Sequence, residues 1–146
     1  MFRKVLVPVD GSPSSLKAAR AAAEVARRFD SQVTLVHVQH LPATALAAPG
    51  VDGMAGMDMA TVEALEEAGR EVLHVARECL GLPDERVKQE RLSGHPAGVV
   101  CRLAEEGGYD LIVMGSRGLS EVGAFFLGSV SDKVSHHAPC PVLIVR

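Results

Sequence analysis

Four glycines fall within residues 114–129, which read MGSRGLSEVGAFFLGS and follow directly on the apolar run DLIV. Because glycine has no Cβ, its backbone can approach a ligand closely. Gly128 and Ser129 stand where a helix is expected to begin, and the first amides of a helix attract anions. Backbone amides and serine hydroxyls in this arrangement predict a site for a phosphate group.

The same stretch differs from the loops of phosphate-transferring enzymes. Residues 123–129, GAFFLGS, resemble the P-loop pattern only in part, because serine stands where that loop has its lysine. Phosphate can still rest on backbone amides and on the hydroxyls of Ser129 and Ser131. After the first expected strand the chain reads DGSPSS, so the G-x-G-x-x-G pattern is absent there. The sequence therefore favours holding a phosphate over hydrolysing it.

Neither a catalytic nucleophile nor a metal site stands out. No serine has the context of a catalytic elbow, and no two carboxylates are spaced as general acid and base. His136, His137 and Cys140 lie close in sequence, but their spacing differs from that of structural zinc sites. Capping of helix carbonyls is the favoured interpretation of the two histidines. His37 lies among apolar residues and is expected to be a core histidine with a satisfied hydrogen bond.

Apolar runs that alternate with helical stripes define the fold class. Four runs rich in β-branched residues predict buried strands at 5–7, 33–38, 111–114 and 142–145, and alternating polarity predicts an edge strand at 86–92. Apolar stripes with helical period occupy 18–29, 62–80, 97–104 and 130–134. This order predicts one domain over residues 1–146, an α/β fold with a doubly wound five-stranded parallel sheet.

Helix ends and one long loop are expected at specific residues. Ser12 with Pro13 predicts the start of the first helix, Thr61 is expected to cap the second, and Gly81 to end it. Residues 39–60 fit neither the strand nor the helix period and are expected to form a long mobile loop.

Ligands in such a sheet bind beyond the carboxyl ends of the strands, where the strand order reverses. Asp10 ends the first strand, and residues 114–118 end the fourth. Asp10 has two interpretations, an Asx turn beside Gly11 or a contact to the ligand.

Composition argues against several partners. The net charge of −3 comes from acidic and basic residues mixed along the chain, whereas nucleic-acid binding needs clustered lysine and arginine. No apolar run approaches the ~18 residues of a membrane span, and the first apolar run stops at Asp10, too early for a signal peptide. We expect a cytoplasmic protein without membrane contact. Cys79, Cys101 and Cys140 lack metal-site spacing and are expected to be reduced and mostly buried.

The glycine spacing and several further segments resemble one known family. Gly115-x2-Gly118-x9-Gly128-Ser129 is similar to the nucleotide signature G-x2-G-x9-G-[ST] of the universal stress proteins. The likeness continues in VLVPVDGS, LVHV, GHPAGVV, DLIVMGSRG and APCPVLIVR, in that order along the whole chain. It implies a Rossmann-like domain with strand order 3-2-1-4-5. It also implies binding of ATP, and sometimes ADP or AMP, with Mg²⁺.

The resemblance also implies roles for individual residues. Carried over by position, Pro8 and Asp10 would lie near the adenosine and the metal, and the backbone of Val38 would contact adenine. Met114 and Gly115 would lie beside the ribose. The phosphates would be bound by Gly118, Gly128, Ser129 and Val130. Arg117 is expected near the phosphates as well. Family members that lack the glycine signature do not bind ATP, and this chain has it.

Strand Val142–Val145 is expected at an exposed edge of the sheet, which invites pairing with another chain. The resemblance implies a homodimer in which this strand pairs with its own copy, an isologous contact. The leading hypothesis is a nucleotide-dependent switch whose surface is recognised by a protein partner not yet identified. Two alternatives remain open, namely slow ATP hydrolysis or autophosphorylation on a serine, and a dimeric interaction module that binds no nucleotide.

Overall fold

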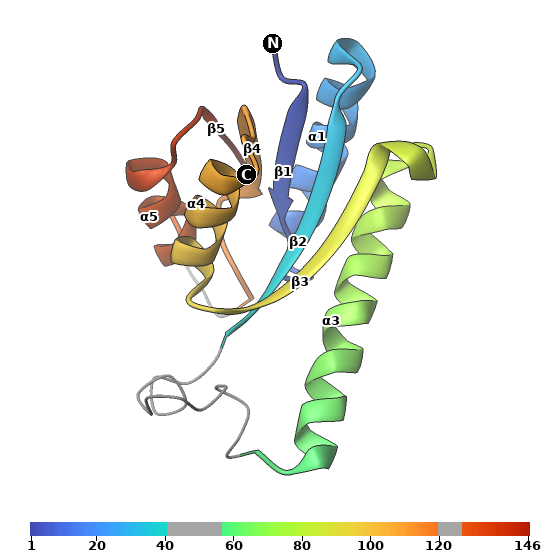
Figure 1. The fold of residues 1–146 in the computed structure, drawn as a ribbon, viewed down its shortest axis with the longest axis vertical. Coiled ribbons are helices and arrows are strands. Elements are labelled where there is room, and N and C mark those ends of the chain that lie inside the picture. The colour runs from blue at the N-terminus through green and yellow to red at the C-terminus, as the bar shows by residue number, and fades with distance from the viewer. Residues whose placement is uncertain (41–56, 120–126) are drawn as a thin grey trace.

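The computed structural model describes residues 1–40, 57–119 and 127–146 (Figure 1). Strands and helices alternate along the chain. In order they are β1 (Lys4–Pro8), α1 (Pro13–Phe29), β2 (Gln32–His40), α3 (Met59–Leu80), a 3-10 turn (Asp84–Arg86), β3 (Val87–Gly94), α4 (Pro96–Glu106), β4 (Leu111–Gly115), α5 (Ser129–His137) and β5 (Val142–Val145).

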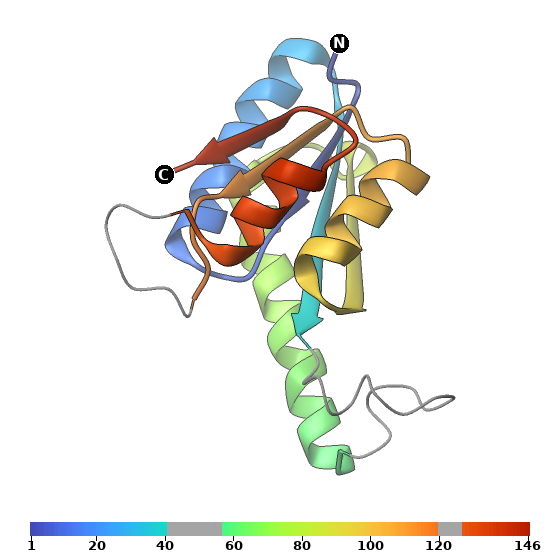
Figure 2. The same cartoon turned by 90° about the vertical axis from the view of Figure 1, so that its left-hand side faces the viewer.

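The strands form one parallel five-stranded sheet in the order β3-β2-β1-β4-β5, which confirms the predicted fold class. Helices α1 and α3 pack on one face, and α4 and α5 pack on the other (Figures 1 and 2). The sheet is therefore the middle layer of three. Strand β3 lies at one edge, as its alternating polarity predicted, and β5 lies at the other.

The core follows from the two kinds of residue that the sequence supplies. Val5, Leu6 and Val7 of the central strand β1 are fully buried, as expected for a strand covered on both faces. Helix α1 meets the sheet through small side chains, among them Ala18 and Ala22, which are also fully buried. Because alanine is short, α1 lies close to the strands.

The helix boundaries confirm Ser12 as the start of α1 and Gly81 as the end of α3, and correct the start of α3. Ser12 caps α1, since its Oγ accepts a hydrogen bond of 3.2 Å from the Ser15 N–H, and Pro13 is the first helical residue. Helix α3 is capped by Asp58, whose Oδ1 accepts a hydrogen bond of 2.9 Å from the Thr61 N–H. The expectation that Thr61 is the cap was wrong, because the carboxylate three residues earlier takes that amide.

The expected loop at residues 39–60 is shorter than predicted at both ends. Strand β2 continues to His40, because its last residues pair with β3, and α3 begins at Met59. The rest of this expectation, residues 41–56, lies outside the described residues. Strand β3 is likewise shifted from the predicted 86–92 to Val87–Gly94. Pairing between β2 and β3 thus extends both strands beyond the C-terminal ends that local polarity indicates.

The cysteines are free thiols, and each is half-buried, which corrects the expectation that they are mostly buried. Burial raises the pKa of the Cys101 and Cys140 thiols, and nearby Asp110 adds to the effect at Cys140. Such thiols are poor nucleophiles at neutral pH. Within the described parts of the chain, no three acidic, histidine or cysteine side chains come together to hold a metal ion. No helix in those parts is long and apolar enough to cross a membrane.

Candidate functional site

A cavity of about 720 Å³ opens at the carboxyl ends of β1, β2 and β4. The chain runs from β1 outward to β2 and β3 and then returns to β4 on the other side of β1, so the cavity lies where the strand order reverses. Ligands of doubly wound sheets bind at this position. The first turns of α4 and α5 form its far walls.

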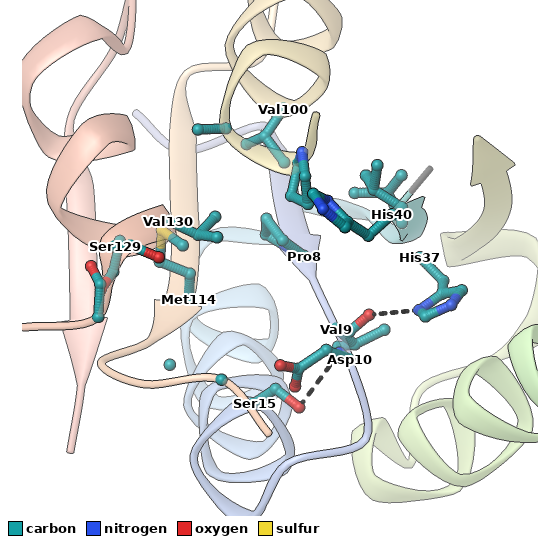
Figure 3. Close-up of a pocket in the computed structure, with 18 of the residues that line it drawn as sticks. Pro8, Val9, Asp10, Ser15, His37, His40, Val100, Met114, Ser129 and Val130 are labelled. Atoms are coloured by element: carbon teal, nitrogen blue, oxygen red, sulfur yellow. Dashed lines mark hydrogen bonds between the residues drawn. The ribbon is translucent and has the colours of Figure 1, made fainter. Parts of the chain in front are cut away.

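All residues that the sequence assigned to a ligand line this one cavity. They are Pro8, Asp10, Val38, Met114, Gly115, Arg117, Gly118, Gly128, Ser129, Val130 and Ser131. In Figure 3 Ser129, Val130 and Met114 lie on one side of Pro8, and His37 and His40 lie on the other. The structure brings the assigned residues together, while their contact with a nucleotide stays a prediction.

Asp10 joins the two loops that form the floor of the cavity. Its Oδ1 accepts a hydrogen bond of 2.9 Å from the Ser12 N–H, which is the Asx turn that the sequence suggested. Its Oδ2 accepts a second hydrogen bond of 3.2 Å from the Leu119 N–H, beyond β4. Gly118 fits beside this carboxylate because a Cβ there would lie 3.0 Å from the Asp10 Oδ2. Asp10 therefore forms the Asx turn and also lines the cavity, so the two interpretations of this residue do not exclude each other.

Gly115 lacks a side chain for a reason of packing. A Cβ on this residue would lie 2.6 Å from the Ser14 Oγ and 2.7 Å from the backbone of Ser14 and Ser15. The start of α1 rests directly on the end of β4, and the Ser14 hydroxyl donates a 2.6 Å hydrogen bond to the Arg117 carbonyl. This glycine thus allows the two loops to meet and shape the cavity.

The start of α5 is tied to the end of β4. The Gly128 N–H donates a hydrogen bond of 2.6 Å to the Ser116 carbonyl. The buried Ser131 hydroxyl lies 2.9 Å from the same carbonyl and 3.0 Å from the Gly128 carbonyl, so it also donates within the protein. The sequence assigned both groups to phosphate, whereas the structure gives them internal partners that position the helix.

The first turn of α5 nevertheless faces the cavity without a side-chain cap. Gly128 is the N-cap residue and supplies no side chain to the following amides. Uncapped amides at a helix start carry partial positive charge and attract anions. Val130 lies in this first turn and lines the cavity, so its amide is a candidate phosphate contact.

The backbone of Val38 faces the cavity from the opposite side. Successive residues of a strand direct their N–H and C=O groups to opposite neighbouring strands. The Val36 carbonyl accepts a hydrogen bond of 2.9 Å from the Val9 N–H, so Val36 faces β1, and Val38 faces the same way. Strand β1 ends at Pro8, in register with Val36, so Val38 extends beyond its last residue. One donor and one acceptor are therefore presented side by side to the cavity.

Several lining residues were missed by the sequence analysis. They are Val9, Ser15, Val36, His37, Gln39, His40, the segment from His95 to Gly98, Val100, Leu119 and Lys133. His37 does have the expected satisfied hydrogen bond, 2.9 Å between its Nδ1 and the Val9 carbonyl, but it also lines the cavity. The rings of His40 and His95 meet edge to face with their centroids 5.9 Å apart, at the end of the cavity next to α4.

The fold and the site define a class of protein, an α/β domain with a cavity at the switch point of a five-stranded parallel sheet. Within this class, residues 1–146 match the Universal stress protein family, and the chain belongs to that family. Universal stress protein MJ0531 of Methanocaldococcus jannaschii is 34% identical over 147 residues, covering 100% of this chain and 83% of that protein. Universal stress protein YxiE of Bacillus subtilis is 33% identical over 150 residues, covering 100% of both.

Solved structures show the same likeness. The hypothetical protein MJ0577 aligns with a TM-score of 0.79 at 26% identity, covering 99% of this chain and 96% of that chain. A universal stress protein in complex with cAMP aligns with a TM-score of 0.66 at 27% identity, covering 99% of this chain and 97% of that chain.

Proposed function

We propose that this protein binds an adenine nucleotide, ATP foremost, in the cavity between β1, β2, β4 and α5. The observation that carries the proposal is the pair of backbone groups on Val38, a donor next to an acceptor, facing the cavity opposite the uncapped start of α5. An adenine ring presents the complementary acceptor and donor on one edge. The phosphates are attached at the other end of the nucleoside, where the uncapped amides at the start of α5 can bind them.

The comparison with solved structures supports the choice of ligand class. A family member at 27% identity, aligned over 99% of this chain, was solved with cAMP, itself an adenine nucleotide. That complex belongs to the other protein. For this chain we propose that the base lies at Val38, the ribose near Met114 and the phosphates at Ser129 and Val130, which all line the cavity.

Magnesium fits the cavity as a companion of the nucleotide. Asp10 is the only carboxylate among the described residues that line it. Mg²⁺ commonly binds one or two carboxylates together with substrate phosphates and keeps several waters. The two hydrogen bonds that the Asp10 carboxylate accepts from backbone amides use only some of its oxygen lone pairs, so others are left to bind Mg²⁺. Mg²⁺ would neutralise phosphate charge here, and Asp10 would hold it against the loop after β1.

The bound nucleotide would act as a switch for a protein partner. It would contact the loops after β1 and β4 together, and these two loops meet at Asp10 and Leu119. We propose this in preference to hydrolysis, because Asp10, the one carboxylate among the described residues that line the cavity, would hold Mg²⁺ and could not also act as a base. Fixing these loops is the change that a partner would recognise.

We also propose that the protein forms a homodimer through β5. Ile112 N–H bonds to the Pro141 carbonyl and Ser116 N–H to the Val145 carbonyl, so alternate residues of β5 face β4. Val142 and Ile144 therefore direct their backbone groups to the free edge of the sheet. An identical strand running the opposite way would pair with them across a two-fold axis.

A thermal-shift series tests the nucleotide proposal. At ATP concentrations a hundredfold above the Kd, binding to the folded state adds about 2.7 kcal/mol to the free energy of unfolding. We expect a raised melting temperature with ATP and smaller or no shifts with GTP, whose base presents a different edge to Val38. A Val38→Pro variant removes the N–H that faces the cavity and should lose the ATP shift. The absence of any shift for ATP, ADP and AMP would refute the proposal.

A further inference from the structure

We propose that Lys133 is a cation that binds the outer phosphates, and that it makes the cavity prefer nucleotides with several phosphates over those with one or none. This rests on the proposed nucleotide function, because it names a contact at the phosphate end of the same site. Lys133 lines the cavity.

Helix geometry places Lys133 over the first turn of α5. Lys133 is four residues after Ser129, so the two share one face of the helix. Their Cα atoms are separated by roughly 6 Å along the axis. Because side chains on a helix tilt toward its N-terminus, the lysine side chain extends back over the turn that begins with Ser129. Its ammonium thus approaches the amides that the proposed function assigns to phosphate.

The direction of the ligand brings its phosphates to this point. Neighbouring strands lie about 4.8 Å apart, so a nucleotide that starts at Val38 on β2 reaches β4, two strands away, after roughly 10 Å. Met114 and Gly115 at the end of β4 are therefore level with the ribose. The phosphates come next, at α5, and the outermost ones lie closest to Lys133.

The charges around Lys133 suit this role. No ion pair involving Lys133 occurs within the ranges 1–40, 57–119 and 127–146. Asp132, the adjacent acid, does not line the cavity and lies within 3.8 Å of the His136 ring on the outer side of the helix. Lysine is a compact charge with three donors on a flexible stem, which suits phosphate oxygens. In a P-loop the lysine that binds phosphate directly follows the last glycine. Lys133 would supply the same charge from a position one helical turn further along the chain.

Calorimetric titrations with adenosine and ATP test the assignment. In Lys133→Ala we expect ATP to bind about tenfold more weakly and adenosine to be unchanged within about twofold, because only ATP reaches the lysine. Lys133→Arg keeps the charge and should retain ATP binding within about threefold of the native protein. Added salt should reduce the preference for ATP more in the native protein than in Lys133→Ala.

Lys17 provides a matched control. It is an exposed lysine four residues after Pro13, the first residue of α1, and therefore holds the same helical position away from the cavity. Lys17→Ala should bind both ligands as the native protein does. Equal binding of ATP by native protein and Lys133→Ala, or an equal loss for ATP and adenosine, would overturn the role of Lys133 and leave the nucleotide site intact. If the native protein binds neither ligand, both proposals are wrong.

Discussion

The carboxylate of Asp10 accepts a hydrogen bond of 3.2 Å from the amide of Leu119, a residue 109 positions later in the chain. With its bond to the Ser12 N–H, this contact joins the loop after β1 to the loop after β4. These are the two loops on either side of the switch point. The side chain that shapes the cavity is thus also its only carboxylate among the described lining residues.

Replacing Asp10 by asparagine should weaken both the loop contact and the binding of Mg²⁺-ATP. Asparagine keeps one acceptor oxygen but turns an N–H₂ group toward the second amide, so we expect a loss of about 1 kcal/mol in the free energy of unfolding. Titration with ATP in the presence and absence of Mg²⁺ should show the larger loss of affinity when Mg²⁺ is present.

Asp110 is the control for this change. It also accepts hydrogen bonds from two backbone amides, those of Arg3 at 2.8 Å and Lys4 at 3.1 Å, but these lie at the start of β1. Asp110→Asn should therefore cost similar stability and leave ATP binding unchanged. Equal effects of the two variants on ATP binding would contradict a binding role for Asp10.

Adding a methyl group to Gly115 should destabilise the fold. The new Cβ would lie 2.6–2.7 Å from Ser14 and Ser15, and two of these contacts are to backbone atoms that cannot turn away. We expect Gly115→Ala to lower the free energy of unfolding by about 1–3 kcal/mol, as overpacked positions do. A Cβ on Gly98 in α4 would meet no neighbouring atom within 4 Å, so Gly98→Ala should be neutral or stabilising. Urea denaturation that ranks the two variants in the opposite order would be inconsistent with this packing.

Proline at Ile144 should disrupt the dimer and spare the subunit. Ile144 directs its N–H to the free edge of the sheet, so proline removes no hydrogen bond within the subunit, and the subunit loses only the packing of the partly buried Ile144 side chain. Sedimentation at micromolar concentration should show a dimer for the native protein and a folded monomer for Ile144→Pro. The backbone N–H of Leu143 instead points to β4, so proline there removes a hydrogen bond within the subunit. Leu143→Pro should therefore unfold at a lower temperature than Ile144→Pro. A monomeric native protein would rule out the β5 dimer.

The cap of α3 should contribute to stability in a pH-dependent manner. Hydrogen bonds from the Thr61 N–H and hydroxyl lower the pKa of Asp58 below its ordinary value of 3.8. A carboxyl whose pKa is lower in the folded state stabilises the fold above its unfolded pKa, and this contribution is lost as the pH falls through the folded value. The difference in stability between native protein and Asp58→Ala should therefore be present at neutral pH and shrink in acid.

Asparagine is the control at this position, because it caps helices well and does not titrate. Asp58→Asn should stay close to the native protein at neutral pH and change less than the native protein on acidification. If Asp58→Ala melts at the native temperature at neutral pH, the side chain does not support the helix.

Much of this fold could be predicted because local patterns and global packing agree. Continuous apolar runs indicated buried parallel strands, and Ser12 with Pro13 fixed the start of α1. The end of β2 could not be predicted in the same way, since Gln39 and His40, beyond the predicted strand 33–38, owe their strand conformation to pairing with β3. Pairing across the chain outweighs local composition at such positions.

The site, too, could be predicted only where local sequence patterns define it. Spacing alone brought Gly115, Gly118 and Gly128 to the right edge of the sheet, but it could not separate a glycine that a ligand needs from one that a neighbouring helix needs. The wall formed by His40 and His95 was missed because β2 and the start of α4 meet only in three dimensions. Lys133 had a signal in the sequence, its position four residues after Ser129, that becomes meaningful only once α5 is known to face the cavity.

Because the proposed site consists of backbone groups, the amide chemical shifts measured by NMR during a titration with ATP are its sharpest test. We predict saturable shifts at the amides of Val38 and Val130, on opposite sides of the cavity, at one nucleotide per chain. The amide of Val87, on β3 and outside the cavity, should not move. Saturating ATP that leaves Val38 and Val130 unmoved, or that shifts only residues outside the cavity, would contradict it.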